Sequence, residues 1–279
     1  MPSQIQLEAA EYNMKAGKAL QKEGNIDQAI TKYKTAIDVC PDYVPVWQSL
    51  ASAYEAQKLW SEAIQCYEKV LTLEPDKIEM YAELGRICRQ ERQIPKAIAH
   101  YQKYLEYKPK KPVQFYLNIA AFFANQKQIP SAIATYEHIL TIKPNQPGVH
   151  YKLGDLYLQK KQPDTALTYF QQAMEVQPDN QQISLKLAEL YQQKGDIPQA
   201  IAHYQKFLAS NPDDFATNKT LGDLFIKQKD YDRALEYYLK ASETKPDSPQ
   251  INRLLGDTLL RKGLDDQALN YYRRAIMDS

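Results

Sequence analysis

Apolar side chains recur along this chain at the three- and four-residue spacing of a helix, in segments separated by short polar turns. The stretch VHYKLGDLYLQKK places Leu153 and Leu156 one turn apart. After a short polar turn, ALTYFQQAMEV does the same with Ala166, Phe170 and Ala173. No segment shows the strict alternation of a strand. The pattern predicts an all-α chain in which helices come in pairs.

These helix pairs recur with a period of about 34 residues. The first marker is a proline behind each pair, with spacings of 34, 34, 35, 34, 34 and 34: Pro41, Pro75, Pro109, Pro144, Pro178, Pro212 and Pro246. The second marker is an alanine in the second helix: Ala29, Ala63, Ala97, Ala132, Ala166, Ala200, Ala234 and Ala268. The two series share one period and the same single interval of 35 residues. Together they predict a repeat architecture.

Two further series share this period. A small residue stands twelve positions before each alanine: Gly17, Ala51, Gly85, Ala120, Gly154, Ala188, Gly222 and Gly256. An aromatic residue stands four positions after it: Tyr33, Tyr67, Tyr101, Tyr136, Phe170, Tyr204, Tyr238 and Tyr272. We expect each small residue to pair with the alanine where the two helices cross, and the ring to fill the space between successive hairpins. The predicted repeats cover about 10–43, 44–77, 78–112, 113–146, 147–180, 181–214, 215–248 and 249–279, as one domain over 1–279.

The second repeat resembles the tetratricopeptide repeat through Trp47, Leu50, Ala51, Tyr54, Ala63, Tyr67 and Pro75. The same pattern extends over residues 10–279. The resemblance implies a right-handed α-solenoid superhelix of antiparallel hairpins. It also implies that the first helices line a concave groove, where members of the family hold peptides or partner proteins.

Composition narrows the choice of function. A net charge of +1 argues against a nucleic-acid partner, which requires a local excess of lysine and arginine. No apolar run is long enough to span a membrane. Cys40, Cys66 and Cys88 lack metal-ligand spacing and indicate reduced thiols in a cytoplasmic protein.

Candidate chemistry is sparse, and we predict no catalytic residue, no cofactor and no metal site. His100 and His203 share one repeat position, whose other occupants indicate a tolerant surface site: Lys32, Cys66, Thr135, Tyr169, Tyr237 and Tyr271. Carboxylates are plentiful but have bases one helical turn away, as in Lys219 with Asp223 and in Arg253 with Asp257.

The partner surface is expected on the face of each first helix that points away from the second helix. Four positions define this first-helix row: three and two residues before the small residue, and one and four residues after it. Its middle is less charged than its ends, which predicts an apolar patch with a basic rim, as in interface hot spots. The candidate residues are Leu117, Asn118, Ala121, Asn125, Tyr151, Leu158 and Leu185, rimmed by Arg86, Arg89, Lys152 and Lys186. The alternative is that these residues contact a neighbouring helix or simply face water.

Two functional classes fit a binding module of this kind. One is a free-standing scaffold or adaptor that binds a partner protein or extended peptide. The other is the recruiting arm of a larger enzyme, such as a glycosyl-, sulfo- or methyltransferase, whose catalytic domain would follow residue 279. The last helix presents Leu269, Tyr272 and Ile276 with no further helix to cover them. Because solenoids need capped ends, this favours a longer natural protein or an end that self-associates.

Overall fold

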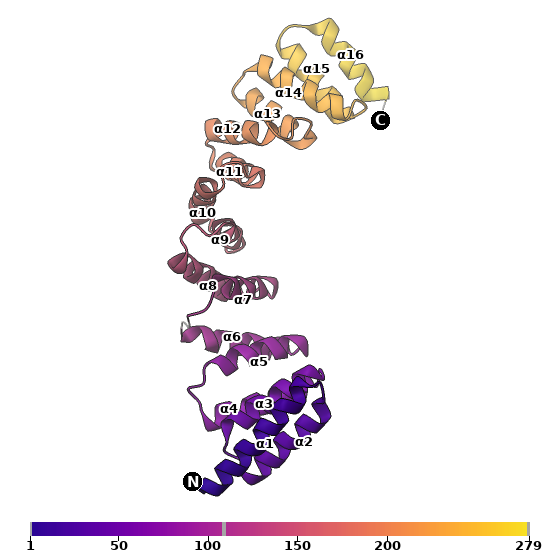
Figure 1. Cartoon of the computed structure of the whole chain (residues 1–279). Coiled ribbons are helices and arrows are strands. Elements are labelled where there is room, and N and C mark those ends of the chain that lie inside the picture. Colours follow the sequence, from indigo (N-terminus) through magenta and orange to yellow (C-terminus); the bar gives the residue numbers. More distant parts are fainter. Residues whose placement is uncertain (1, 108–109, 278–279) are drawn as a thin grey trace. The chain divides into compact units, whose positions relative to one another are not determined.

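The structure is a computed structural model that describes residues 2–107 and 110–277. Within these ranges it is all-helical, with sixteen α-helices and no strand (Figure 1). The helices are α1 (Gln4–Lys22), α2 (Ile26–Val39), α3 (Val44–Ala56), α4 (Trp60–Leu73), α5 (Glu79–Gln90), α6 (Ile94–Glu106), α7 (Val113–Asn125), α8 (Ile129–Ile142), α9 (Val149–Gln159), α10 (Pro163–Val176), α11 (Gln181–Lys194), α12 (Ile197–Leu208), α13 (Phe215–Lys227), α14 (Tyr231–Thr244), α15 (Pro249–Arg261) and α16 (Asp265–Met277).

The chain divides into two compact units, Met1–Thr135 (unit 1) and Tyr136–Ser279 (unit 2), with the boundary inside α8. In both units the helices follow one another in pairs with a short turn inside each pair, and the pair of α7 and α8 contains the boundary. The first hairpin starts earlier than predicted, because Ser3 caps α1: its hydroxyl accepts from the Gln6 amide at 3.3 Å, and the Gln6 side chain accepts from the Ser3 amide at 2.8 Å.

Side chains of the predicted series form the core. All eight marker alanines are buried, with exposed fractions of 0 to 1%. The small residues twelve positions earlier are buried as well. The aromatic residues are buried in the first seven hairpins, and Tyr272 is half-buried in the last. The residues that recur with the repeat period are therefore the ones that pack the hairpins.

The partner of the small residue differs from the prediction. A Cβ atom added at Gly222 would lie 2.3 Å from the ring of Tyr238, and one added at Gly154 would lie 2.8 Å from the ring of Phe170. The nearest atoms in both cases belong to the aromatic residue of the same hairpin, not to the marker alanine. A glycine is suited to this position because the ring lies directly against the helix backbone.

The aromatic ring also reaches the next hairpin. In unit 1, the ring of Tyr101 meets those of Phe122 and Phe123 on α7 edge-on, with centroids 5.4 and 6.4 Å apart. Such edge-to-face pairs stabilise packing beyond the area they bury. One side chain thus joins its own first helix to the following repeat.

The position of His203 is not the tolerant surface site predicted above. The imidazole is half-buried and stacks on Tyr191, with ring centroids 5.5 Å apart and an interplanar angle of 11°. The equivalent rings stack in the same way in the hairpins before and after, as Tyr157 with Tyr169 and Phe225 with Tyr237. In three successive hairpins of unit 2, a pair of parallel rings therefore connects the first helix to the second.

A left-handed residue begins the turn inside every hairpin. Glycine occupies this position in three hairpins, as Gly24, Gly195 and Gly263, with φ between 74° and 85°. A lysine or arginine takes the same conformation in the other five, with φ between 57° and 60°: Lys58, Arg92, Lys127, Lys161 and Lys229. A residue with a Cβ is strained in this region, so these five turns lower the stability of the fold.

Hydrogen bonds tie the linkers to the following helix. The indole of Trp47 donates to the carbonyl of Pro41 at 2.7 Å, and Asn218 donates to the carbonyl of Pro212 at 2.7 Å. Asn252 donates to Pro246 in the same way, at 3.1 Å. The marker proline therefore ends one hairpin and anchors the next. Within the described ranges, no helix combines the length and apolar character needed to cross a membrane.

Candidate functional site

The first-helix row is accessible in both units. In unit 2 every residue of the row is exposed or half-buried. In unit 1 the same holds except for Met14, Ser49 and Ala82, which are buried. The row therefore contributes little to the core, and its side chains are available to a partner over most of each unit.

The predicted patch divides between the two units. Unit 1 contains its first six members: Leu117, Asn118, Ala121, Asn125, Arg86 and Arg89. Unit 2 contains the other five: Tyr151, Lys152, Leu158, Leu185 and Lys186. Each set is a surface of its own unit.

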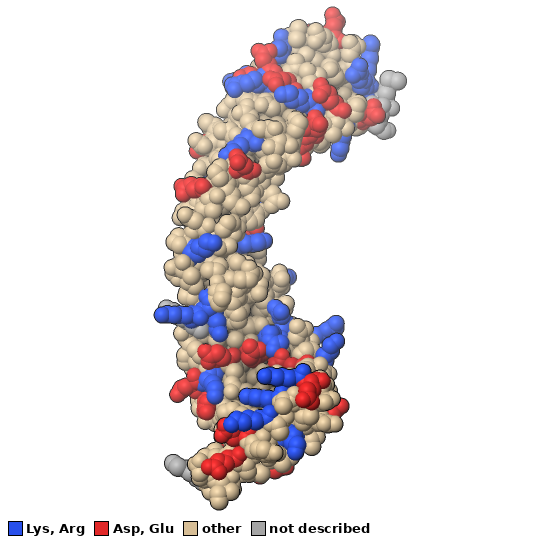
Figure 2. All heavy atoms as spheres, in the orientation of Figure 1, with Lys and Arg blue, Asp and Glu red and all other residues tan. Residues whose placement is uncertain are grey.

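In unit 1 the patch centres on α7, which carries no charged residue. Asn118, Ala121 and Asn125 are exposed, and Leu117 is half-buried. The Asn118 side-chain oxygen accepts from Gln114 at 3.1 Å, which leaves its amide hydrogens for a partner. In the view of Figure 2, few charged atoms cover the surface over α7 to α10, in contrast to α1 to α6.

Arg86, a predicted member of the basic rim, is paired with carboxylates of its own unit. Its guanidinium pairs with Glu83 at 2.8 Å and with Glu55 of the preceding hairpin. Glu55 also accepts from the Tyr67 hydroxyl at 2.7 Å. These contacts commit Arg86 to a polar network between α3, α4 and α5. Arg89 remains exposed, with its guanidinium 5.9 Å from the Phe122 ring centroid.

In unit 2 the apolar members of the patch are partly used in packing. Tyr151 meets Phe170 edge-on at 5.4 Å, and both Tyr151 and Leu158 pack against the core of α10 and α11. Leu185 packs against the core formed by its own hairpin and by α13 to α15. The structure thus supports the alternative in part: these three side chains contact neighbouring helices and present only one side to solvent.

Charged members of this surface surround a carboxylate that the patch omitted. Asp155 is half-buried, and burial raises its pKa, an effect that the nearby Lys186 and Lys152 oppose. Lys186 pairs weakly with Glu189 at 3.6 Å, whereas Lys152 is exposed. Asp155 belongs to the first-helix row, so its position could have been read from the repeat.

Hydroxyl groups of the marker tyrosines reach the first-helix row, which the sequence reasoning missed. Tyr33 donates to Gln21 at 2.8 Å, and Tyr204 donates to Gln192 at 2.7 Å. In the last two hairpins the acceptor is a carboxylate: Tyr238 donates to Asp223 at 2.6 Å and Tyr272 to Asp257 at 2.7 Å. The preference for tyrosine over phenylalanine at this position could have indicated these hydrogen bonds.

A hollow of about 220 Å³ opens on the first-helix row of unit 2, away from the predicted patch. It is lined by Asp223, Ile226, Lys227, Tyr238, Leu254, Asp257, Thr258 and Arg261. Lys219 pairs with Asp223 at 2.8 Å as predicted, but the predicted pair of Arg253 with Asp257 does not form. In the described part of the chain, Lys227 and Arg261 have no ion-pair partner, so the hollow combines apolar walls with available charges.

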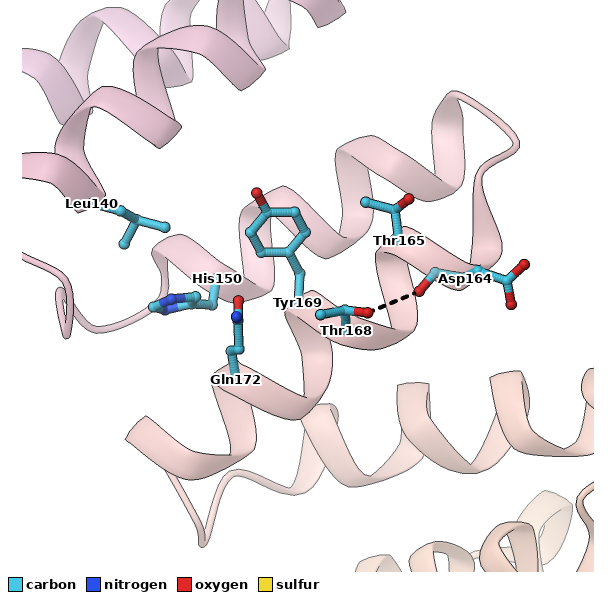
Figure 3. A pocket seen from close by; sticks show the side chains of 7 residues that line it. All are labelled: Leu140, His150, Asp164, Thr165, Thr168, Tyr169 and Gln172. Carbon is cyan, nitrogen blue, oxygen red and sulfur yellow. Dashed lines mark hydrogen bonds between the residues drawn. The ribbon is translucent and has the colours of Figure 1, made fainter.

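A second hollow of unit 2, of about 570 Å³, lies between α8, α9 and α10 (Figure 3). His150, Tyr169 and Asp164 contribute to its lining, but the Asp164 carboxylate points away from the imidazole. Burial lowers the pKa of His150, which favours the neutral form of the ring, and Glu175 opposes this effect. Thr168 donates its hydroxyl to the backbone carbonyl of Asp164 at 3.3 Å. Across residues 2–107 and 110–277, no group of three or more His, Cys, Asp or Glu side chains could hold a metal ion.

Comparison with known proteins assigns the family. Profiles described as tetratricopeptide repeat, or TPR repeat, match residues 17–58, 44–77, 78–111, 157–221 and 219–279. The chain belongs to the tetratricopeptide repeat family, an α-solenoid class that typically serves as a non-catalytic protein-interaction module.

Solved structures agree on the fold. The C-terminal part of a TPR repeat-containing protein from Cytophaga hutchinsonii aligns with a TM-score of 0.54 at 19% identity, covering 87% of this chain and 99% of that one. A crystal structure of MamA aligns with a TM-score of 0.52 at 22% identity, covering 60% of this chain and 91% of that one. MamA AMB-1 aligns with a TM-score of 0.52 at 19% identity, over 59% and 90%. None of the curated proteins matches the sequence.

Proposed function

We propose that this chain is a binding scaffold that holds an extended segment of a partner protein along the first-helix row. The observation that carries the proposal is the accessibility of this row. All of it in unit 2, and all but Met14, Ser49 and Ala82 in unit 1, is exposed or half-buried, whereas the marker alanines and the small residues are buried throughout. Such a row provides one set of contacts for a partner in each hairpin, at a regular spacing. Catalysis is not part of the proposal.

The chemistry of the row suits an extended peptide. In unit 1, the exposed amide of Asn118 in the row and that of Asn125, next to its last position, can pair with the peptide backbone. In unit 2, the hollow between α13 and α15 offers the apolar side chains of Ile226 and Leu254 beside Lys227 and Arg261. Apolar walls with charges at the edge give both affinity and orientation.

A cytoplasmic location is part of the same proposal. Cys40, Cys66 and Cys88 are all free and buried. Burial raises the pKa of the Cys66 thiol to about 12, so it is protonated and unreactive at neutral pH. Buried thiols without a disulfide are typical of a reducing compartment.

The experiment is a selection of peptides that bind the whole chain from a random phage-displayed library, followed by calorimetry on variants. The Asn118→Ala and Lys152→Ala double variant removes two exposed side chains of the row, one in each unit. We expect at least a tenfold loss of affinity, about 1.4 kcal/mol. Tyr151 is left in place because its ring packs on Phe170.

The matched control is the double variant Thr168→Ala and Gln172→Ala. Both residues are exposed and line the hollow between α8, α9 and α10, which lies outside the first-helix row (Figure 3). Its affinity for the selected peptides should equal that of the unmodified chain. The proposal fails if the two double variants lose affinity equally, or if only the control loses it.

A further inference from the structure

The hollow between α13 and α15 has an apolar floor whose hydroxyl groups are already hydrogen-bonded. Ile226 and Leu254 are half-buried there and pack against the core of α11 to α15. The Thr258 hydroxyl donates to the backbone carbonyl of Leu254 at 2.7 Å, and the Tyr238 hydroxyl donates to Asp223 at 2.6 Å. The hydroxyl protons are thus in use, and the floor offers a partner mainly apolar surface. With a volume of about 220 Å³, the hollow suits one large apolar side chain.

The two carboxylates at the hollow already have partners within the chain. Asp223 accepts from the Tyr238 hydroxyl and pairs with the ammonium of Lys219 at 2.8 Å. Asp257 accepts from the Tyr272 hydroxyl at 2.7 Å. A basic side chain of a partner would therefore compete with Lys219 for Asp223 and would share Asp257 with a hydroxyl.

The two cations that line the hollow have no such partner. Lys227 and Arg261 occupy the same repeat position, five residues after Gly222 and Gly256, in the last turn of α13 and of α15. Both are exposed, and neither forms an ion pair with any residue that the structure describes. Together with Lys219 they outnumber the two carboxylates. The charge that remains available at the hollow is therefore positive.

We propose that this hollow receives a leucine or another large apolar side chain from an acidic segment of the partner, whose neighbouring carboxylates pair with Lys227 and Arg261. The inference rests on the proposed function, because Ile226, Leu254 and both carboxylates of the hollow belong to the first-helix row. Burial of the apolar side chain supplies most of the affinity. The exposed ion pairs add less, and they select acidic over basic segments.

Fluorescence anisotropy of a labelled peptide, Gly-Glu-Glu-Leu-Glu-Glu-Gly, tests this partner class on the full chain. In one companion peptide serine replaces the leucine, and in a second companion lysine replaces each glutamate. We expect the acidic leucine peptide to bind about tenfold more tightly than either companion. Its affinity should also fall as sodium chloride is added, because salt screens exposed ion pairs.

The double variant Lys227→Gln, Arg261→Gln removes both free cations and should bind the acidic peptide about tenfold more weakly. The matched control is the double variant Lys143→Gln, Arg273→Gln. It changes the net charge by the same amount at two exposed positions of unit 2 that do not line the hollow. The control should bind like the unmodified chain. Circular dichroism checks that both double variants are folded, which their exposed positions lead us to expect.

Three results would overturn the inference: no binding of the acidic peptide, equal binding of either companion, or equal losses in the two double variants. The proposed function survives any of them if peptides selected from the library still lose affinity in the Asn118→Ala, Lys152→Ala variant. If that dependence on the first-helix row is absent as well, both the inference and the proposed function fail.

Discussion

Units 1 and 2 use the same packing series but differ at the row position that follows each small residue. In unit 1 this position holds Lys18, Ser52, Arg86 and Ala121. In unit 2 it is acidic in every hairpin, with Asp155, Glu189, Asp223 and Asp257. The marker alanines are buried in both units, and the aromatic position holds a ring in every hairpin. Packing therefore restricts some repeat positions to one kind of side chain, whereas the first-helix row is free to differ, and specificity can reside there.

The marker tyrosines are held differently from one hairpin to another. Tyr67 in unit 1 and Tyr238 and Tyr272 in unit 2 donate to acidic residues of the row. Among the described residues, Tyr101 of unit 1 has no hydrogen-bond partner for its hydroxyl, and neither does Tyr136 at the start of unit 2. The carboxylates of Glu55, Asp223 and Asp257 thus also order the rings beneath the row.

The largest effect should come from overfilling a packing position in one unit. Ala166→Leu inserts a larger side chain at a fully buried site of unit 2, which should cost about 1–3 kcal/mol. Ala97→Leu does the same in unit 1. Because hairpins interact mainly with their neighbours, hydrogen exchange should accelerate in the unit that carries the change. Equal acceleration in both units would mean that the chain unfolds as one cooperative body.

A smaller loss of stability should distinguish marker tyrosines whose hydroxyl has a hydrogen-bond acceptor from those whose hydroxyl has none. Tyr238→Phe removes a hydrogen bond to the Asp223 carboxylate and should cost about 1–2 kcal/mol. Tyr136→Phe is the matched change at a hydroxyl without such a partner and should cost less than about 0.5 kcal/mol. Urea unfolding monitored by hydrogen exchange in unit 2 gives both values. Similar costs would show that the acidic row does not order the rings.

Relief of a strained turn should raise stability in either unit. Lys161→Gly in unit 2 and Lys58→Gly in unit 1 place glycine at a left-handed position. The gain should be up to about 1 kcal/mol, because relief of strain exceeds the added freedom of the unfolded chain. Thermal unfolding measures the gain. The reverse change, Gly195→Lys, should lower stability by a similar amount, and a neutral result there would exclude strain as the cause.

The smallest effect should appear on acidification. Burial lowers the pKa of His203 below its ordinary value, and nearby Lys206 adds to this. The folded state then binds the proton less readily than the unfolded chain, so stability is complete at pH 7 and falls as the pH drops below about 6.5. His203→Tyr keeps a stacked ring, as at Tyr237 in the next hairpin, and should reduce this loss in unit 2. An unchanged dependence of unfolding on pH between 7 and 5 would contradict the assignment to His203.

The hairpins and their core could be predicted because packing repeats. Each position of the period meets the same steric demand eight times, so spacing alone identified the alanines and small residues that are buried. Spacing did not show which side chain lies against which. The ring of Tyr238 over Gly222 and the left-handed Lys161 depend on backbone geometry, which residue identity does not determine.

The candidate site was less predictable for a related reason. Side chains of the first-helix row are long and polar, and their contacts depend on neighbouring hairpins. Arg86 is held by Glu55, which lies 31 residues earlier, and Tyr151 packs on Phe170. Such pairs are invisible when each position is judged by its own charge or hydropathy. The hollow beside Asp257 was missed because the prediction favoured uncharged positions.

Amide chemical-shift mapping would show whether a partner binds along the first-helix row. A peptide selected by the whole chain would be titrated into the isotope-labelled protein. We expect the largest shifts on row residues of the first helices, such as Asn118 on α7, Lys152 on α9 or Asp257 on α15. Shifts confined to the second helices, with the row unperturbed, would contradict it.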